Sequence, residues 1–155
     1  MPLTLKEKFL RSVGNRRDKS GFLSDQSVIE ARTDLLDPDD RNLLRAVLIY
    51  DQPTKVVAQI NRTTLPVIRH RIRRLIARIS SPQFVSVARS LHLLNDEQFA
   101  VVKAHILQGK SFHATSEATS LRYHTIRRVL AEVDGIVTGL VKAEEKYPLH
   151  QERYK

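Results

Sequence analysis

The sequence has 155 residues, 41% of them hydrophobic, which suits one domain of ordinary size or two very small ones with a buried core. Its formal net charge of +9 points to a polyanionic partner, either nucleic acid or an anionic membrane surface. The chain contains no cysteine, which excludes disulfides and zinc fingers, and no apolar run approaches the roughly 18 residues needed to span a bilayer. The first residues, MPLTLKEKF, lack the pattern of a signal peptide, so we predict a cytoplasmic protein without a membrane partner.

The positive charge is concentrated in the middle of the chain. Residues 35–92 carry ten basic and four acidic side chains, whereas residues 93–155 carry nine and eight. The stretch from Gln52 to Asn95 contains no Asp or Glu, although a solvated surface normally mixes both signs. Its densest part, RHRIRRLIAR, places five arginines within ten residues, where like charges at helical spacing repel one another. We therefore predict that this block contacts a polyanion outside the chain.

Residues 35–80 have the pattern of three helices. A first helix through RNLLRAVLIY has Asp37 or Asp39 as its N-cap candidate, and a short second helix follows in TKVVAQIN. The tripeptide RTT makes a turn. After it, Thr64 and the proline two residues later are suited to begin a third helix, which ends near Ile79.

A shift of 58 residues aligns this unit with a second one of similar pattern. The segment LDPDDRNLLRAVLIYDQPTKVVAQINRTTLPVIRHRIRRL matches LNDEQFAVVKAHILQGKSFHATSEATSLRYHTIRRVLAEV in apolar positions more than in identities, so chance alignment of two amphipathic segments is the alternative. The period suits two copies of a trihelical unit better than a solenoid repeat. We predict an all-α tandem helix-turn-helix protein with a long C-terminal helix. Its expected parts are a partly flexible N-terminal arm at 1–34, the first unit at 35–80, a linking helix at 81–93, the second unit at 94–147 and a tail at 148–155.

A long helix, a short helix, a tight turn and a basic third helix follow the order of the helix-turn-helix, whose third helix enters the DNA major groove. Residues near the start of such a helix read bases, whereas those farther along contact phosphate. The planar guanidinium of arginine suits both guanine edges and phosphate oxygens. The DNA-binding candidates are Arg62, Thr64, Val67, Arg69, His70, Arg73, Arg74 and Arg78 in the first unit, and Arg122, Tyr123, His124, Arg127 and Arg128 in the second.

The second unit, in LNDEQFAVVKAHILQGKSFHATSEATSLRYHTIRRVLAEV, resembles the helix-turn-helix of KorA-type plasmid repressors and, more loosely, of PapB-type fimbrial regulators. The first, in LIYDQPTKVVAQINRTTLPVIRHRIRRLIARI, is similar in rhythm to the DNA-binding region 4 of bacterial sigma factors. Such families commonly carry glycine in the turn before the third helix, where this chain has Arg62 and Ser120. The resemblance implies a transcription regulator of bacterial or mobile-element origin. For such a DNA-binding protein we predict a nucleoid-associated location in the cytoplasm.

Catalytic chemistry has little support in the sequence. His105, His113 and His124 are spaced too widely for a metal pair on one helix. We find no phosphate-binding glycine loop, nucleophile elbow or constellation of paired carboxylates. We expect no enzymatic activity, no metal and no cofactor.

The end of the second unit leaves two alternatives open. Its apolar stripe continues toward Tyr147, either as a helix that packs on its own domain or as the seam of a homodimer. Gly135 and Gly139 would permit close helix approach, or would bend or break the helix. The near-neutral charge of this unit also suits an adaptor that binds double-stranded DNA through the first unit and docks RNA polymerase or another regulator through the second. RNA binding is less favoured because only 6% of the residues are aromatic.

Overall fold

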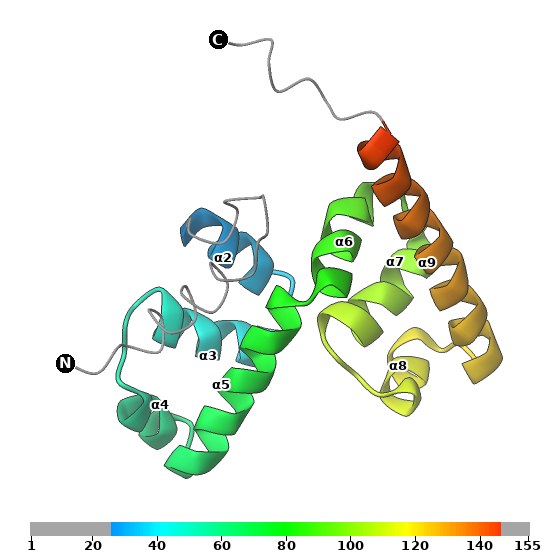
Figure 1. Cartoon of the computed structure of the whole chain (residues 1–155). Helices are drawn as coiled ribbons and strands as arrows, with labels where there is room; N and C mark the ends of the chain where they lie inside the picture. The colour runs from blue at the N-terminus through cyan, green and yellow to red at the C-terminus, as the bar shows by residue number, and fades with distance from the viewer. Residues whose placement is uncertain (1–25, 147–155) are drawn as a thin grey trace, which may run out of the picture. The chain divides into compact units, whose positions relative to one another are not determined.

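The computed structural model describes residues 26–146, which form helices joined by turns and short loops, with no strand in that range. The expected all-α class is therefore confirmed (Figure 1). The chain divides between Ser81 and Pro82 into two compact units, called unit 1 and unit 2 below. Residues 1–25 of the expected N-terminal arm and the tail expected at 148–155 lie outside the described residues.

Unit 1 is built, in its described part, from α2 Gln26–Thr33, α3 Pro38–Leu48, α4 Thr54–Ile60 and α5 Leu65–Ser80. Asp37 is the N-cap of α3 and Thr64 the N-cap of α5, as predicted, and each helix carries a proline within its first two positions. Proline fits there because the first N–H groups of a helix have no intrahelical partner.

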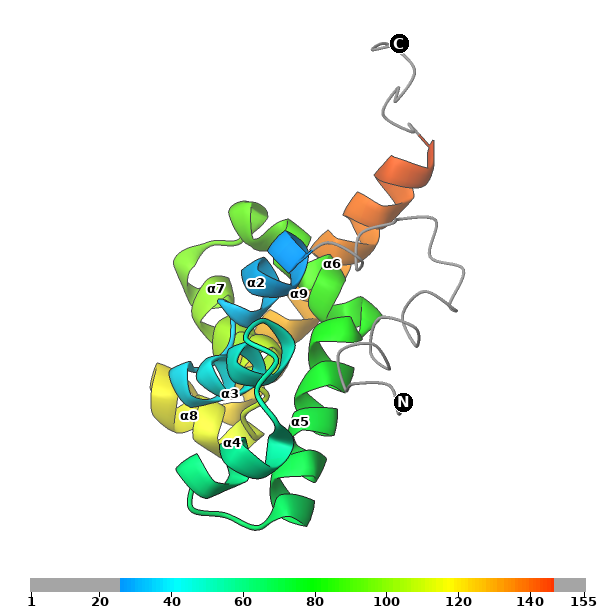
Figure 2. The ribbon, with the colours of Figure 1, turned by 90° about the vertical axis from the view of Figure 1, so that its left-hand side faces the viewer.

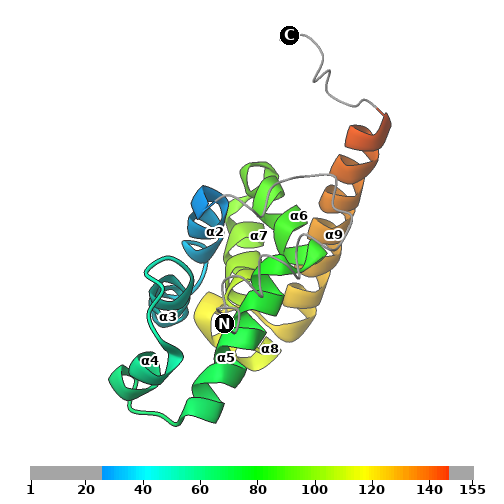
Figure 3. The same cartoon turned by 60° about the vertical axis from the view of Figure 1, so that its left-hand side comes forward.

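The core of unit 1 lies where α5 packs against α3 and α4. Figures 1 and 3 show α4 and the first turns of α5 at one end of the unit, joined by a short turn. The side chains that fill this core are apolar and recur at helical spacing. They are Leu43, Leu44, Val47 and Leu48 from α3, Val57 and Ala58 from α4, and Ile68, Ile72, Leu75 and Ile79 from α5.

Helix α2 lies within the region predicted as an N-terminal arm, yet it belongs to the fold of unit 1. It packs beside α3 (Figure 2), and Ile29 is buried. Arg32 is buried as well, and its Nη1 donates to the carbonyl oxygen of Ile79 at the end of α5, 3.1 Å away. Because QSVIEART has few apolar residues, its periodicity is too weak to predict this helix.

Unit 2 contains α6 Pro82–Ser90, a 3₁₀ turn at Leu91–Leu93, α7 Asp96–Val102, a π-helical segment at Lys103–Leu107, α8 Phe112–Thr119 and α9 Tyr123–Lys146. Helix α6, expected as a linker between units, packs against α9 and the π-helical segment. Its Phe84 and Val87 are buried there, so α6 contributes to the core of unit 2. The remaining core residues are Val101, Val102, Ala104, Leu107, Ile126, Val129 and Val133.

The two units repeat the same three-helix backbone at an offset of 58 residues. Helices α3, α4 and α5 begin at residues 38, 54 and 65, and α7, α8 and α9 begin at residues 96, 112 and 123. The residues with positive φ repeat as well: Asp51 at 51° corresponds to Gly109 at 66°, and Arg62 at 51° to Ser120 at 57°. Chance alignment of amphipathic segments does not reproduce matching turns, so these positions support an internal repeat.

The backbone hydrogen bonds that follow α3 in unit 1 and α7 with its π-helical segment in unit 2 also correspond. Both units close this turn with one backbone bond between residues five apart and one between residues six apart. In unit 1 these run from Tyr50 N to Arg45 O (3.0 Å) and from Gln52 N to Ala46 O (2.9 Å), and in unit 2 from Gln108 N to Lys103 O (2.9 Å) and from Lys110 N to Ala104 O (3.0 Å).

Helix α9 runs without interruption through Gly135 and Gly139, so neither glycine breaks it. A Cβ added at either position would meet no atom within 4 Å, which means that no described segment of unit 2 outside α9 approaches them closely. The buried residues of α9 end at Val133. The homodimer seam stays a prediction.

Candidate nucleic-acid interface

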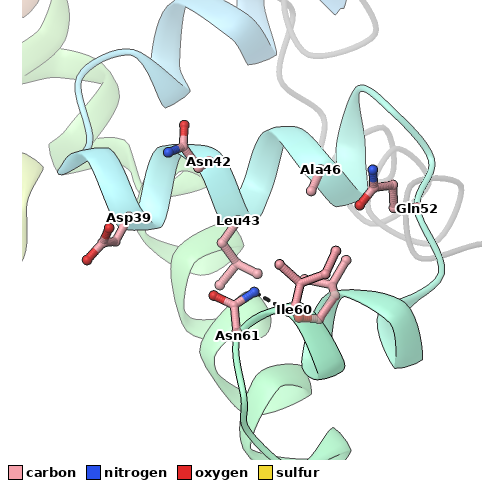
Figure 4. A pocket seen from close by; sticks show the side chains of 8 residues that line it. Asp39, Asn42, Leu43, Ala46, Gln52, Ile60 and Asn61 are labelled. Carbon is pink, nitrogen blue, oxygen red and sulfur yellow. Dashed lines mark hydrogen bonds between the residues drawn. The ribbon is translucent and has the colours of Figure 1, made fainter.

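The turn between α4 and α5 sets the position of the basic helix in unit 1. Asn61 ends α4 and donates from its Nδ2 to the carbonyl oxygen of Val57, 2.8 Å away (Figure 4). The backbone N–H of Thr63 donates to the carbonyl oxygen of Ala58 at 3.0 Å, which closes the turn. Thr64 is the N-cap of α5 and has an extended backbone. Its exposed side-chain hydroxyl makes no capping hydrogen bond to the helix.

Arg62 lies in this turn with a φ of 51°, the left-handed conformation that glycine favours. A non-glycine residue in that region costs on the order of 1 kcal/mol. The exposed guanidinium of Arg62 beside the start of α5 is therefore carried by a strained backbone position.

Glycine at this position gives a prediction in which stability and binding change in opposite directions. Arg62→Gly should raise the free energy of unfolding of unit 1 by about 1 kcal/mol because it relieves the left-handed strain. The same change should weaken binding to duplex DNA because a cation at the turn is lost. Denaturant unfolding and a fluorescence-anisotropy titration measure the two effects. Ser120→Gly is the matched control: it should stabilise unit 2 similarly and leave DNA affinity unchanged.

Helix α5 separates an apolar face from a cationic one. Ile68, Ile72, Leu75 and Ile79 are buried, whereas Arg69, His70, Arg73 and Arg74 are all exposed. Among residues 26–146, no carboxylate lies within ion-pair distance of Arg62, Arg69, Arg73 or Arg74. The Nε of Arg73 donates only a long bond, 3.4 Å, to the carbonyl oxygen of Arg69. The start of α5 therefore presents cations that this part of the chain does not neutralise.

The other two arginines of RHRIRRLIAR have an internal partner. Arg71 donates from Nε and Nη2 to the same oxygen of Asp40, at 3.0 and 2.6 Å. Nη1 of Arg78 lies 3.8 Å from the second carboxylate oxygen, and the Asp40 side chain is only 14% exposed. Burial lowers the pKa of the Arg78 guanidinium, although Asp40 opposes this effect. The candidate Arg78 thus lies against α3, and the five arginines divide into three without a carboxylate partner among the described residues and two that are paired with Asp40.

One DNA-binding candidate on the exposed face of α5, Val67, is apolar. Val67 is 56% exposed, in the first turn of α5, while its neighbour Ile68 is fully covered. An exposed valine at this place is suited to contact the methyl group of thymine in a major groove.

The candidates of unit 2 are all exposed at the start of α9, but two of its arginines have partners within the unit. Arg128 Nη2 lies 3.2 Å from Glu97 and its Nε lies 3.5 Å from Glu132. The guanidinium of Arg127 lies over the ring of Phe112, 5.7 Å from its centre. At the 58-residue offset, Arg73 and Arg74 of unit 1 correspond to Ala131 and Glu132. This face of unit 2 is therefore much less positive than its equivalent in unit 1.

Aromatic and histidine side chains lie near the start of α9 in unit 2. The rings of His105 and Phe112 lie 4.6 Å apart, and Tyr123 Oη lies 3.1 Å from His113 Nδ1. Tyr123 is 49% exposed and Phe112 37%. The sequence predicts Tyr123 as a DNA-binding candidate but not Phe112. The repeat offset, which places Phe112 where unit 1 has Thr54, is the signal that identifies it.

Two hollows lie within the described units. In unit 1, Leu43 points toward Ile60 and Asn61 in a notch of about 220 Å³ between α3 and α4 (Figure 4). In unit 2, a groove of about 380 Å³ lies between α6, the π-helical segment and α9, with His105 and Asp134 on its lining. No group of three or more potential metal ligands occurs within residues 26–146. Over the same range, none of the helices has both the length and the apolar character needed to cross a membrane.

Comparison with known proteins found no match to a protein-family model, a curated protein or a solved structure.

Proposed function

We propose that the chain is a sequence-specific regulator of transcription that binds double-stranded DNA through unit 1. The observation that carries this proposal is the exposed face at the start of α5, where Arg69, Arg73 and Arg74 have no carboxylate partner among the described residues. A duplex offers a high density of phosphates and, in its major groove, guanine edges that arginine binds with two hydrogen bonds.

The roles of the individual side chains follow from their places on α5. Arg69 and Arg73 are the base readers, because they lie in the first half of an exposed helix face, and Val67 adds an apolar contact. Arg74 and Arg62 contact phosphate on either side. Thr64, with a hydroxyl that does not cap the helix, is suited to a further phosphate contact.

A second candidate function is favoured by the difference between the units. Unit 2 has Arg128 paired with Glu97 and Glu132, and exposed Phe112 and Tyr123 where unit 1 has Thr54 and Leu65. Aromatic residues and arginine are enriched in the centres of protein interfaces. In this adaptor function unit 1 holds the DNA, and unit 2 docks RNA polymerase, another regulator or a second copy of the chain.

Selection of duplexes from a randomised library with the full chain tests the proposal. We expect enrichment of one short motif, and footprinting of that motif should protect a discrete site. Failure to enrich any sequence, with equal binding to all duplexes, would leave only non-specific DNA binding. Arg127→Ala with Arg128→Ala then separates the two roles of unit 2, because a protected region that shrinks on one side indicates DNA contact and an unchanged one favours the adaptor.

A further inference from the structure

Asp40 connects the DNA-binding helix of unit 1 to the helix that supports it. It lies in the first turn of α3, accepts both bonds from Arg71 with one oxygen, and has Arg78 beside the other. Arg71 and Arg78 are seven residues apart, two helical turns, so both project from one side of α5. That side faces α3 and not the exposed face that carries Arg73.

This arrangement is absent from unit 2, although the backbone repeats. At the 58-residue offset, Asp40, Arg71 and Arg78 correspond to Gln98, Val129 and Ile136. Gln98 serves instead in the capping box of α7, where its backbone N–H and side chain exchange bonds with Asn95. Val129 is buried as an ordinary core residue. The three-helix backbone therefore does not require the pairing of Asp40 with Arg71 and Arg78. Of the two units, only unit 1, with the exposed arginines of α5, has this pairing.

We propose that Asp40 is a specificity-determining residue of unit 1, because it holds Arg71 and Arg78 against α3 and so keeps both cations away from DNA. This inference rests on the proposed function of unit 1. Phosphate contacts raise affinity for every sequence alike, whereas base contacts raise affinity for one. Two further arginines free to reach phosphate would thus strengthen binding to random DNA more than binding to the preferred site. Asp40 also fixes α5 relative to α3, on which alignment of Arg69 and Arg73 with base edges depends.

Asp40→Asn in the full chain tests the inference, with binding to random-sequence duplex and to the selected motif followed across a series of salt concentrations. The variant should bind random duplex severalfold more tightly, and the ratio of specific to non-specific affinity should fall. The slope of log affinity against log salt should steepen by about 1 to 2, because each newly contacted phosphate adds about 0.9. A role in stability alone would leave this slope unchanged.

Asp39→Asn is the matched control. Asp39 lies next to Asp40 in the first turn of α3, is exposed, and has no basic side chain within ion-pair distance among residues 26–146. Its substitution changes the net charge and the helix terminus in the same way but releases no arginine. If both variants show the same slope and the same specificity ratio, the inference is wrong.

A triple variant decides the matter if Asp40→Asn does not fold. Asp40→Asn combined with Arg71→Gln and Arg78→Gln removes the half-buried charges together. Its DNA binding should keep the wild-type salt slope, because neither arginine contacts DNA. A slope lower by about 1 to 2 would show that Arg71 and Arg78 already bind phosphate, and would overturn the inference. Failure of the wild-type chain to bind duplex DNA would instead overturn the proposed function itself.

Discussion

Replacing Arg69, Arg73 and Arg74 together with alanine should abolish most of the affinity of the chain for its DNA site. Each arginine that contacts a base or a phosphate contributes on the order of 1 to 3 kcal/mol, so the three changes should cost at least about 3 kcal/mol, or roughly 100-fold in Kd. All three side chains are exposed, so the free energy of unfolding should change little. A fluorescence-anisotropy titration against the selected duplex measures the loss.

The single variants distinguish the proposed base-reading arginines from the proposed phosphate contact. Arg69→Ala and Arg73→Ala should each relax discrimination at one or two base pairs, whereas Arg74→Ala should weaken binding to all sequences alike. Lys142→Ala is the control, because that lysine is exposed on α9 of unit 2, beyond the last buried residue of this helix, and is not among the DNA-binding candidates. If the triple variant of unit 1 loses no more affinity than this control, α5 is not the DNA-binding helix.

Ile72→Ala should destabilise unit 1 more than any single change at its surface. Ile72 has no exposed surface and lies between Ile68 and Leu75 on the buried face of α5. Removing its side chain leaves a cavity as well as losing apolar burial, which costs about 2 to 5 kcal/mol. Denaturant unfolding, together with hydrogen exchange of the α5 amides, measures the change within unit 1.

Ile60→Ala provides the comparison for that core substitution. Ile60 is also an isoleucine of unit 1 but is 68% exposed at the end of α4. Its truncation should alter the free energy of unfolding by no more than about 0.5 kcal/mol. Equal losses for the two variants would contradict the packing of α5 described above.

Much of the fold could be predicted because local signals were strong. Thr64 before a proline marked the start of α5, and the apolar spacing from Ile68 to Ile79 marked its buried face. The two segments aligned at the 58-residue offset share few identical residues, yet their helix starts and left-handed turns fall at equivalent positions. Arg62 and Ser120 adopt the glycine-like conformation, so the missing glycines did not signal a different turn.

Other features depended on contacts that no local pattern contains. Helix α2 is held by Ile29 and by the bond from Arg32 to a residue 47 positions later, so its weak periodicity could not reveal it. The division of the five arginines depends on Asp40, 31 residues before Arg71. The sequence therefore predicted a cationic helix but not which of its cations are free to bind a partner.

The salt dependence of binding to random-sequence duplex tests the central claim most directly. With Arg62, Arg69, Arg73 and Arg74 as the available cations, log affinity of the wild-type chain should fall linearly with log salt. On random-sequence duplex Arg69 and Arg73 have no preferred bases to bind, so all four arginines should contact phosphate. The slope magnitude should then be about 3 to 4, since each phosphate contact contributes about 0.9. An affinity that does not change with salt, or the absence of binding at low salt, would contradict the assignment of α5 as the DNA-binding surface.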